Sequence, residues 1–256
     1  MSINPYDSPV SSRQRAGRRR GRPAEYVSAR FRTWLASGFL GITAFLALVK
    51  LASDIGALAS LGSSTQEPIP DSIVLRTAVL NLASFLVFFP TSAFFLAWFY
   101  RAYRNLAALD AKRLQYSPAS AVWWWFVPFA NLWMPYDAAS EIWSFSRPLG
   151  TRNRSALVGW WWAAWIAHNV CDSLSSVVFR RFSAATLNAN WFLPLGSDVL
   201  TLTASVLAIC VVHGVYLRQE ARHAQMIMSA NAAALSAEPA AEPSAPASGQ
   251  PEGTDF

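Results

Sequence analysis

The chain is poor in charged residues, which make up 14% of its 256 residues, whereas a soluble domain carries about 25%. It has only two cysteines and three histidines. The cysteines lie in apolar segments and suggest no disulfide framework, and the histidines are too few for a multi-histidine metal site. Phosphate-loop, zinc-protease and Gly-x-Ser-x-Gly motifs are absent. We therefore expect no enzyme, no catalytic residue, no metal and no cofactor.

Hydrophobic residues, in contrast, make up 53% of the chain. The charges collect in a few short segments and leave long windows almost uncharged, which is the pattern of a polytopic membrane protein. The net charge of +6 arises largely from an arginine cluster at the N-terminus, comprising Arg13, Arg15, Arg18, Arg19, Arg20 and Arg22. Such a cluster before a span favours contact with anionic lipid at a cytoplasmic face, and no motif indicates nucleic-acid binding.

These patterns predict an all-α integral membrane protein with four transmembrane helices and a proline-broken re-entrant or interfacial helical element. About 20 apolar residues are needed for each crossing. The expected spans are 33–53, 73–100, 156–179 and 191–217, and the broken element is 117–143. This membrane domain, 30–223, lies between a basic N-terminal tail, 1–29, and an Ala/Pro/Glu tail, 224–256. Both tails are predicted to be disordered.

The broken element, 117–143, holds five of the chain's twelve tryptophans and three prolines. Pro118 favours a helix start, whereas Pro128 and Pro135, with Asn131 between them, interrupt the apolar run. Two short half-helices around this elbow are expected. Irregular backbone is tolerated at membrane depth only where protein or water covers it, and tryptophan prefers the membrane interface. We therefore predict that 117–143 enters and leaves on one face.

The distribution of Lys and Arg predicts the topology. If 117–143 does not cross, 17 of these residues lie on the cytoplasmic side and three outside, with Lys50 set aside. If it crosses, the numbers become 14 and six. The positive-inside rule therefore favours four spans with both termini in the cytoplasm. Five spans are the alternative.

Polar residues directly after the second span are candidates for a site. Arg101, Arg104 and Asn105 either contact lipid phosphate or pair with Glu141 and Asp137 across the cytoplasmic face. We favour the second interpretation, a structural clamp that holds the broken element.

The third span contains His168 and Asp172, which share a helix face because they are four residues apart. An ionisable residue at membrane depth is costly and suggests a function, here a proton relay or an oriented cation ligand. The alternative is hydrogen bonding between helices, with Ser205, Thr201 or Asn81 as partners.

Two further charges lie within or beside apolar segments. Lys50 stands four residues before Asp54, and we interpret it as a snorkelling lysine with a nearby partner. Asp198 begins the fourth span, where it is expected to cap the helix or to pair with Arg180 or Arg181.

Four stretches carry a family resemblance: Trp98–Leu106, Tyr116–Pro118, Trp124–Tyr136 and Glu141–Trp143. They resemble a bacterial membrane family known as domain of unknown function 4328, over about 75–217. The resemblance implies a multi-pass protein of the bacterial inner membrane. It implies no function, because the family has none assigned.

Two hypotheses of function follow. In the first, the protein is a non-enzymatic scaffold or interaction protein whose tails meet lipids or partners. In the second, it is a small transporter or channel-like protein with a site at 117–143 and the His168/Asp172 pair, since many transporters build sites from broken helices. A single copy of four spans shows no inverted repeat, so a pore would require a homo-oligomer or another membrane partner.

Overall fold

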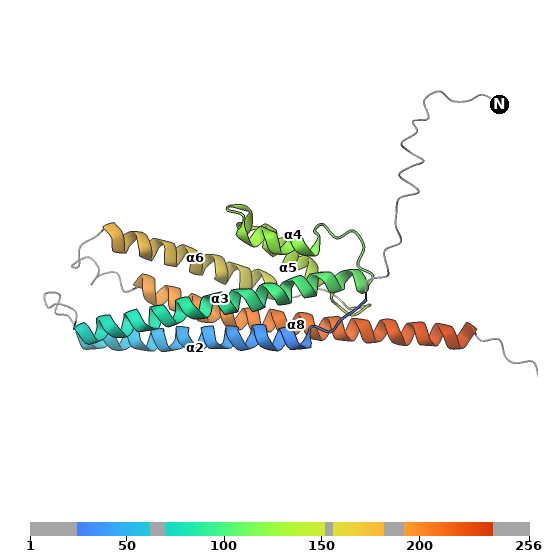
Figure 1. The fold of residues 1–256 in the computed structure, drawn as a ribbon, viewed down its shortest axis with the longest axis horizontal. Coiled ribbons are helices and arrows are strands. Elements are labelled where there is room, and N and C mark those ends of the chain that lie inside the picture. The colour runs from blue at the N-terminus through green and yellow to red at the C-terminus, as the bar shows by residue number, and fades with distance from the viewer. Residues whose placement is uncertain (1–24, 62–69, 152–155, 182–191, 238–256) are drawn as a thin grey trace, which may run out of the picture.

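A computed structural model describes residues 25–61, 70–151, 156–181 and 192–237, and these ranges contain helices and turns but no strand (Figure 1). The four long helices are α2 (Arg30–Leu61), α3 (Asp71–Ala108), α6 (Leu157–Arg181) and α8 (Phe192–Ala237). Each contains nearly all of one expected span. The prediction of an all-α protein is confirmed.

Three of these helices, α2, α3 and α8, are long and apolar enough to cross a membrane. The helix α6 has 25 residues, which is also a sufficient length. Its second half carries His168, Asn169 and Asp172 together with three serines, and these polar residues lower its mean hydropathy.

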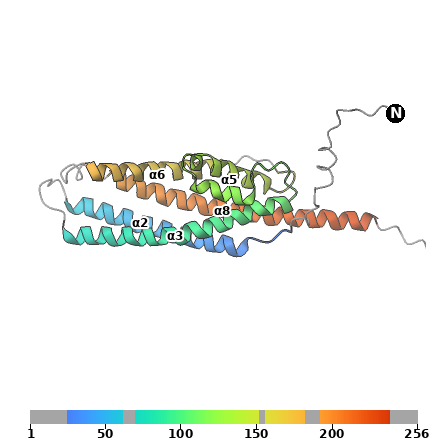
Figure 2. The same cartoon turned by 45° about the horizontal axis from the view of Figure 1, so that its top comes forward.

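The long helices lie side by side in the order α3, α2, α8, α6, so that α8 packs against both α2 and α6. Neighbours in this order run antiparallel, and Figure 2 shows α6 and α8 as one layer above α2 and α3. The start of α2, the end of α3 and the start of α6 lie together at one end of the bundle. We call this end the basal end. The C-terminal part of α8 extends beyond it (Figure 1).

The expected half-helices form a wedge, residues 117–145, between α3 and α6 near the basal end. Its elements are α4 (Pro118–Trp123), the 3₁₀ turns η1 (Trp124–Phe126) and η2 (Ala130–Leu132), and α5 (Met134–Phe145). The helix α4 begins with a capping box, in which the Ser120 amide donates to the Ser117 hydroxyl and the Ser117 amide donates to the Ser120 hydroxyl. This box satisfies backbone donors that the first helical turn leaves unpaired.

The wedge is fastened by aromatic packing around Trp125. Ring pairs at such separations add to the free energy of apolar burial by about 0.5–1.5 kcal/mol each. The centroid of the Trp125 ring lies 5.5–6.4 Å from those of Phe95, Phe99, Trp161, Trp162 and Trp165. In addition, Trp162 Nε1 donates to the Leu132 carbonyl oxygen at 3.0 Å. The wedge thereby joins α3 to α6.

The predicted disorder of 224–256 is wrong for residues 224–237, because α8 continues to Ala237. This part is rich in alanine and methionine, with leucine and glutamine, all of which have high intrinsic helix propensity. An existing helix also extends without a new nucleation cost. Residues 238–256 lie outside the described part of the chain.

The predicted disorder of 1–29 is likewise wrong for 25–29, while 1–24 lie outside the described residues. The Tyr26 ring stacks on His223 with centroids 4.1 Å apart, and its hydroxyl donates to Glu220 at 3.1 Å. Burial and the nearby Glu220 carboxylate raise the pKa of Tyr26. Asn105 Nδ2 donates to the Val27 carbonyl oxygen at 3.0 Å, and Ala29 is buried. These contacts hold the segment although it lacks apolar periodicity.

We predict that Gly214→Ala destabilises the contact between α8 and α5. A Cβ at Gly214 would lie 2.8 and 2.9 Å from Cζ3 and Cη2 of Trp143. That ring is buried, and the Arg218 guanidinium lies 3.6 Å from its centroid, so it has little room to move. Overpacking of this kind costs about 1–3 kcal/mol, to be measured by thermal unfolding in detergent.

Gly196→Ala is the matched control, since Gly196 lies on the same helix and a Cβ there would meet nothing within 4 Å. Its unfolding midpoint should stay the same or rise, because alanine has the higher helix propensity. Equal midpoints for Gly214→Ala and the unmodified protein would contradict the close approach of α8 to Trp143.

Candidate functional site

A buried hydrogen-bond network joins α3, α8 and α5 at the basal end. Gln219, 1% exposed, donates through Nε2 to the Ala102 carbonyl oxygen at 2.9 Å and to the Ser146 hydroxyl at 3.0 Å. Its Oε1 accepts from Asn105 Nδ2 at 3.1 Å, and Asn105 also bonds the carbonyl oxygen of Val27. Two neutral amides therefore hold the last turns of α3 and α5, the middle of α8 and the N-terminal segment together.

Sequence reasoning found Asn105 but missed Gln219, which lies just beyond the expected fourth span. A signal was present, because Gln219 follows Val212 and Val215 at i+7 and i+4, the spacing of one helix face. All three residues are buried. A glutamine that continues an apolar stripe is a candidate buried hydrogen-bonding group.

The expected pairing of Arg101 and Arg104 with Glu141 is wrong. Arg101 is buried, and its Nε donates to the Val27 carbonyl oxygen at 3.3 Å, while Arg104 is exposed. The partner of Glu141 on α3 is the hydroxyl of Tyr103. Helical geometry explains the difference, because residues two apart on a helix point about 200° apart. Tyr103 faces α5, so Arg101 cannot.

The predicted clamp is thus formed by a tyrosine and a carboxylate. The Tyr103 hydroxyl donates to Glu141 and accepts from the Tyr116 amide at 3.0 Å. The other carboxylate oxygen of Glu141 accepts from the Gln115 amide at 3.0 Å. Burial, with the carboxylates of Asp137 and Glu141, raises the pKa of Tyr116. These bonds fix the loop before α4 against α5.

The elbow residues of the wedge have different surroundings. Pro135 is buried in the first turn of α5, whereas Pro128 is exposed. Asn131 Oδ1 is buried without a hydrogen-bond partner in the described part of the chain. The intervening Phe129 has a φ of +64°, a left-handed conformation that is strained for a bulky residue.

The tip of the wedge carries an apolar patch. Each of its large side chains is at least half exposed, and Phe129 reaches 79%. The members of this tip patch are Trp123, Phe126, Phe129, Leu132 and Trp133. Clustered exposure of this kind marks a surface that contacts a membrane or another protein.

A second polar group lies along α8, away from the basal end. Lys50 Nζ of α2 is 3.1 Å from Asp198 Oδ1 of α8, and the Asp198 side chain is only 5% exposed. Lys50 therefore pairs with a residue of another helix rather than with Asp54, and Asp198 lies inside α8 and does not cap it. The side chains of Arg180 and Arg181, the other expected partners of Asp198, lie outside the described part of the structure. Asp198 Oδ2 is buried and has no hydrogen-bond partner among the residues described.

His168 of α6 contacts a neighbouring face of α8. Its Nδ1 lies 2.9 Å from the Thr201 hydroxyl and 3.2 Å from the Ser197 hydroxyl, so hydrogen bonding to Thr201, one of the expected alternatives, is present. Asp172 is exposed, and no hydrogen bond between described residues joins it to His168. Ser197 and Asp198 point about 100° apart, which lets them face α6 and α2 respectively.

No group of three or more His, Cys, Asp or Glu side chains in the described ranges is placed to hold a metal ion. The two polar groups instead offer neutral amides, hydroxyls, one imidazole and one ion pair. Such groups form hydrogen bonds between helices and, at Asp198 and His168, can exchange protons.

These features define an all-helical protein with several helices fit to cross a membrane. The family model described as "Domain of unknown function (DUF4328)" matches residues 69–216, more than half of the chain, and the chain belongs to this family. The resemblance stated for 75–217 is confirmed. Neither the curated proteins nor the solved structures contain a match to this chain.

We predict that Gln219→Leu lowers the free energy of unfolding. The change leaves the Ala102 carbonyl and Asn105 Nδ2 short of a partner, at about 1–3 kcal/mol for each buried group left unpaired. Chemical unfolding in detergent measures the loss. Gln225→Leu on the same helix is the control, since its bond to the Leu149 amide is exposed and its effect should stay within about 0.5 kcal/mol.

A double-mutant cycle tests the network itself. Asn105→Leu combined with Gln219→Leu should cost less than the sum of the two single changes, because each single change strands the other amide. Strictly additive costs would show that the two amides do not interact.

Proposed function

We propose that the protein is a non-enzymatic scaffold or interaction protein of the bacterial inner membrane. In this proposal α2, α3, α6 and α8 all cross the bilayer, both termini are cytoplasmic, and the wedge lies in the cytoplasmic leaflet as an interfacial or re-entrant element. The observation that carries the proposal is the tip patch, an apolar surface on a firmly anchored element.

Lipid is the environment that suits the tip patch. Phe129 adopts a strained backbone conformation although its side chain is mostly exposed, so contacts within the chain do little to offset the strain. Burying apolar surface from water stabilises by about 25 cal/mol for each Å², and acyl chains would provide that burial. Trp123 and Trp133 at the same tip suit the headgroup boundary, where tryptophan is enriched.

The fold supports the proposed topology by gathering cationic residues at the basal end. Arg30 begins α2, Arg104 lies in the last turns of α3, and Arg147 follows α5. Arg76, in contrast, lies near the opposite end, where its Nη2 donates to the Ser53 carbonyl oxygen. A basic basal end suits the cytoplasmic face. The arginine-rich residues before Tyr26 would then meet anionic lipid there.

A scaffold role accords with how the wedge is held. Its contacts are aromatic stacking at Trp125, the Tyr103–Glu141 clamp and the bond from Trp162 to the Leu132 carbonyl. Interactions of these kinds fix one geometry, as a docking platform requires. The basal end would present this platform to lipids or to a second membrane protein.

We predict the labelling pattern of single cysteines in intact inverted and right-side-out vesicles. In a background with Cys171 and Cys210 replaced by alanine, Leu149→Cys and Ser229→Cys should react with a membrane-impermeant maleimide only from the cytoplasmic side. Ser60→Cys should react only from the other side. All three positions are exposed on the protein. If a cysteine there does not react, the cause is therefore that the membrane separates it from the maleimide, not that the protein buries it.

Phe129→Cys tests the depth of the wedge in the same background. It should react in detergent but poorly from either side of intact vesicles, because lipid covers the tip. Labelling of Leu149→Cys from the side that labels Ser60→Cys would overturn the four-span topology, and full labelling of Phe129→Cys from the cytoplasm would overturn insertion of the tip.

A second candidate function, proton-linked transport, is favoured by the charged group on α8. A buried ion pair at membrane depth is costly and marks a functional position by default. Lys50, Asp198 and His168 belong to three helices that meet along α8. The sequence suggested His168 and Asp172 as the candidate proton-exchanging groups. For this second candidate function, His168 and Asp198 take their place.

We predict, for this second candidate, that proteoliposomes carrying the protein conduct protons, measured with an entrapped pH-sensitive dye. Asp198→Asn and His168→Gln should abolish the flux, since neither substitute titrates near neutral pH. Asp172→Asn is the control and should leave it unchanged, because Asp172 is exposed. Absence of flux with the unmodified protein removes this candidate.

A further inference from the structure

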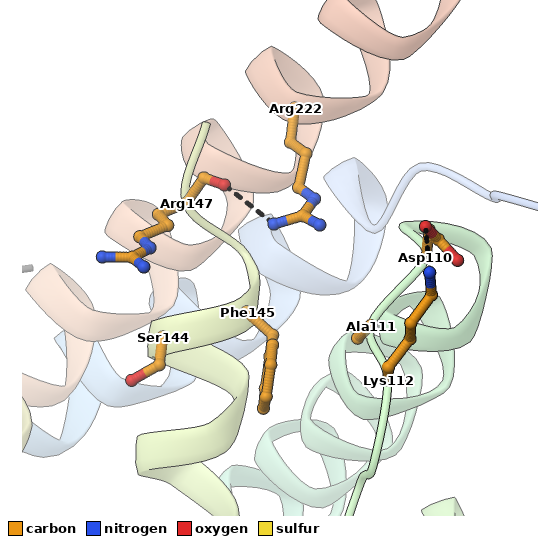
Figure 3. A pocket seen from close by; sticks show the side chains of 7 residues that line it. All are labelled: Asp110, Ala111, Lys112, Ser144, Phe145, Arg147 and Arg222. Atoms are coloured by element: carbon orange, nitrogen blue, oxygen red, sulfur yellow. Dashed lines mark hydrogen bonds and ion pairs between the residues drawn. The ribbon is translucent and has the colours of Figure 1, made fainter. Parts of the chain in front are cut away.

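A pocket at the basal end lies apart from both the tip patch and the Lys50–Asp198 pair. Its volume is about 680 Å³, within the range of small-molecule sites. Three segments form its walls: the turn after α3, the end of α5 and the basal part of α8 (Figure 3). The lining residues are Asp110, Ala111, Lys112, Ser144, Phe145, Arg147 and Arg222.

The pocket has an excess of positive charge. Lys112, Arg147 and Arg222 oppose one lining carboxylate, that of Asp110. Lys112 Nζ lies 3.7 Å from Asp110 Oδ2, and both side chains are largely exposed, so this pair holds neither group firmly. No carboxylate in the described ranges pairs with Arg147 or Arg222. Uncompensated cations around a hollow attract an anion.

Arg222 is presented in a fixed position. Its Nε donates to the Leu109 carbonyl oxygen at 3.1 Å and its Nη1 to the Arg147 carbonyl oxygen at 3.2 Å. Figure 3 shows the guanidinium directed from α8 toward the segment that follows α5. Both carbonyls lie just after a helix end, where acceptors are otherwise unpaired. Arg222 thereby ties the ends of α3 and α5 together and needs no carboxylate for its orientation.

We propose that this pocket binds the phosphate group of an anionic ligand, with Arg222 as an oriented guanidinium and Lys112 and Arg147 as the further cations that contact the phosphate. Guanidinium and ammonium groups are the side chains that recognise phosphate. Phe145 and Ala111 add an apolar wall, which suits a glycerol or acyl portion next to the phosphate. The source of the phosphate is a lipid headgroup or a soluble phosphate ester.

The turn that carries Asp110 and Lys112 is built to expose them. Asp110 has a φ of +54° and Arg113 a φ of +61°, so two left-handed residues reverse the chain directly after α3. Asparagine and aspartate tolerate this conformation better than other non-glycine residues. Asp110→Asn therefore removes the opposing charge without disturbing the turn.

The test measures apparent Kd from the rise in the thermal unfolding midpoint of the full chain in a neutral detergent. The probes are dihexanoyl phosphatidylglycerol, dihexanoyl phosphatidylcholine and glycerol 3-phosphate. Lys112→Gln and Arg147→Gln should each weaken binding of phosphatidylglycerol about fivefold, the expected effect of one basic residue near an anionic headgroup. Asp110→Asn should tighten it.

Arg113→Gln is the matched control, because Arg113 is adjacent to Lys112 and exposed but does not line the pocket. It should change the Kd less than twofold. Binding of phosphatidylglycerol alone identifies a lipid headgroup, and binding of glycerol 3-phosphate as well identifies a soluble ester. Equal weakening by Arg113→Gln and Lys112→Gln, or equal binding of phosphatidylcholine, which has a phosphate but no net charge, would overturn the pocket as a site for an anionic phosphate ligand.

Discussion

The packing of Trp125 between α3 and α6 is the interaction on which the arrangement depends. The helices α3 and α6 lie at opposite ends of the row α3, α2, α8, α6 and make little direct contact. The wedge occupies the space between them near the basal end, and its aromatic contacts reach both. Without it, the two outer helices would be held through α2 and α8 and by little direct contact, such as the ring pair Phe95–Trp161 at 5.9 Å. A segment interrupted by prolines thus closes one side of the bundle.

Polar residues then determine which helix surfaces meet. Burying an amide or a charge is unfavourable unless it is paired, so each buried polar group restricts the rotation and offset of the helices around it. Gln219 and Asn105 restrict the rotation and offset of the helices at the basal end, where α3, α5 and α8 converge. Lys50 and Asp198 set the contact of α2 with α8 farther along. Because α8 takes part in both, it acts as the axis of the fold.

The basal end also gathers the surfaces that offer contact with other molecules. The tip patch presents aromatic side chains, and the pocket at Arg222 presents cations, on opposite ends of the same short helix α5 and its flanks. The Tyr103–Glu141 clamp lies between these two surfaces. An apolar surface and a cationic pocket on one rigid element match the two layers of a leaflet, acyl chains and phosphate headgroups. This correspondence accords with the proposed placement of the basal end at a membrane surface.

The sequence by itself determined the features that depend on neighbouring residues along the chain. Apolar runs predicted the four long helices, Pro128 and Pro135 predicted the broken element, and the motif around Asn131 predicted the family. Hydrogen bonding of His168 between helices was expected only as an alternative with three possible partners, of which the structure shows Thr201. These conclusions needed only local propensity, helix period and motif spacing.

Only the tertiary structure decided which side chains meet. Glu141 pairs with Tyr103 rather than an arginine, and Asp198 pairs with Lys50, almost 150 residues away in the chain. Residues 25–29 and 224–237 are ordered by contacts and helix continuation that composition did not indicate. The physical reason is that pairing depends on the relative rotation and offset of packed helices. These are set by the whole apolar surface of each helix, including the ring of Trp125, and no local pattern encodes them.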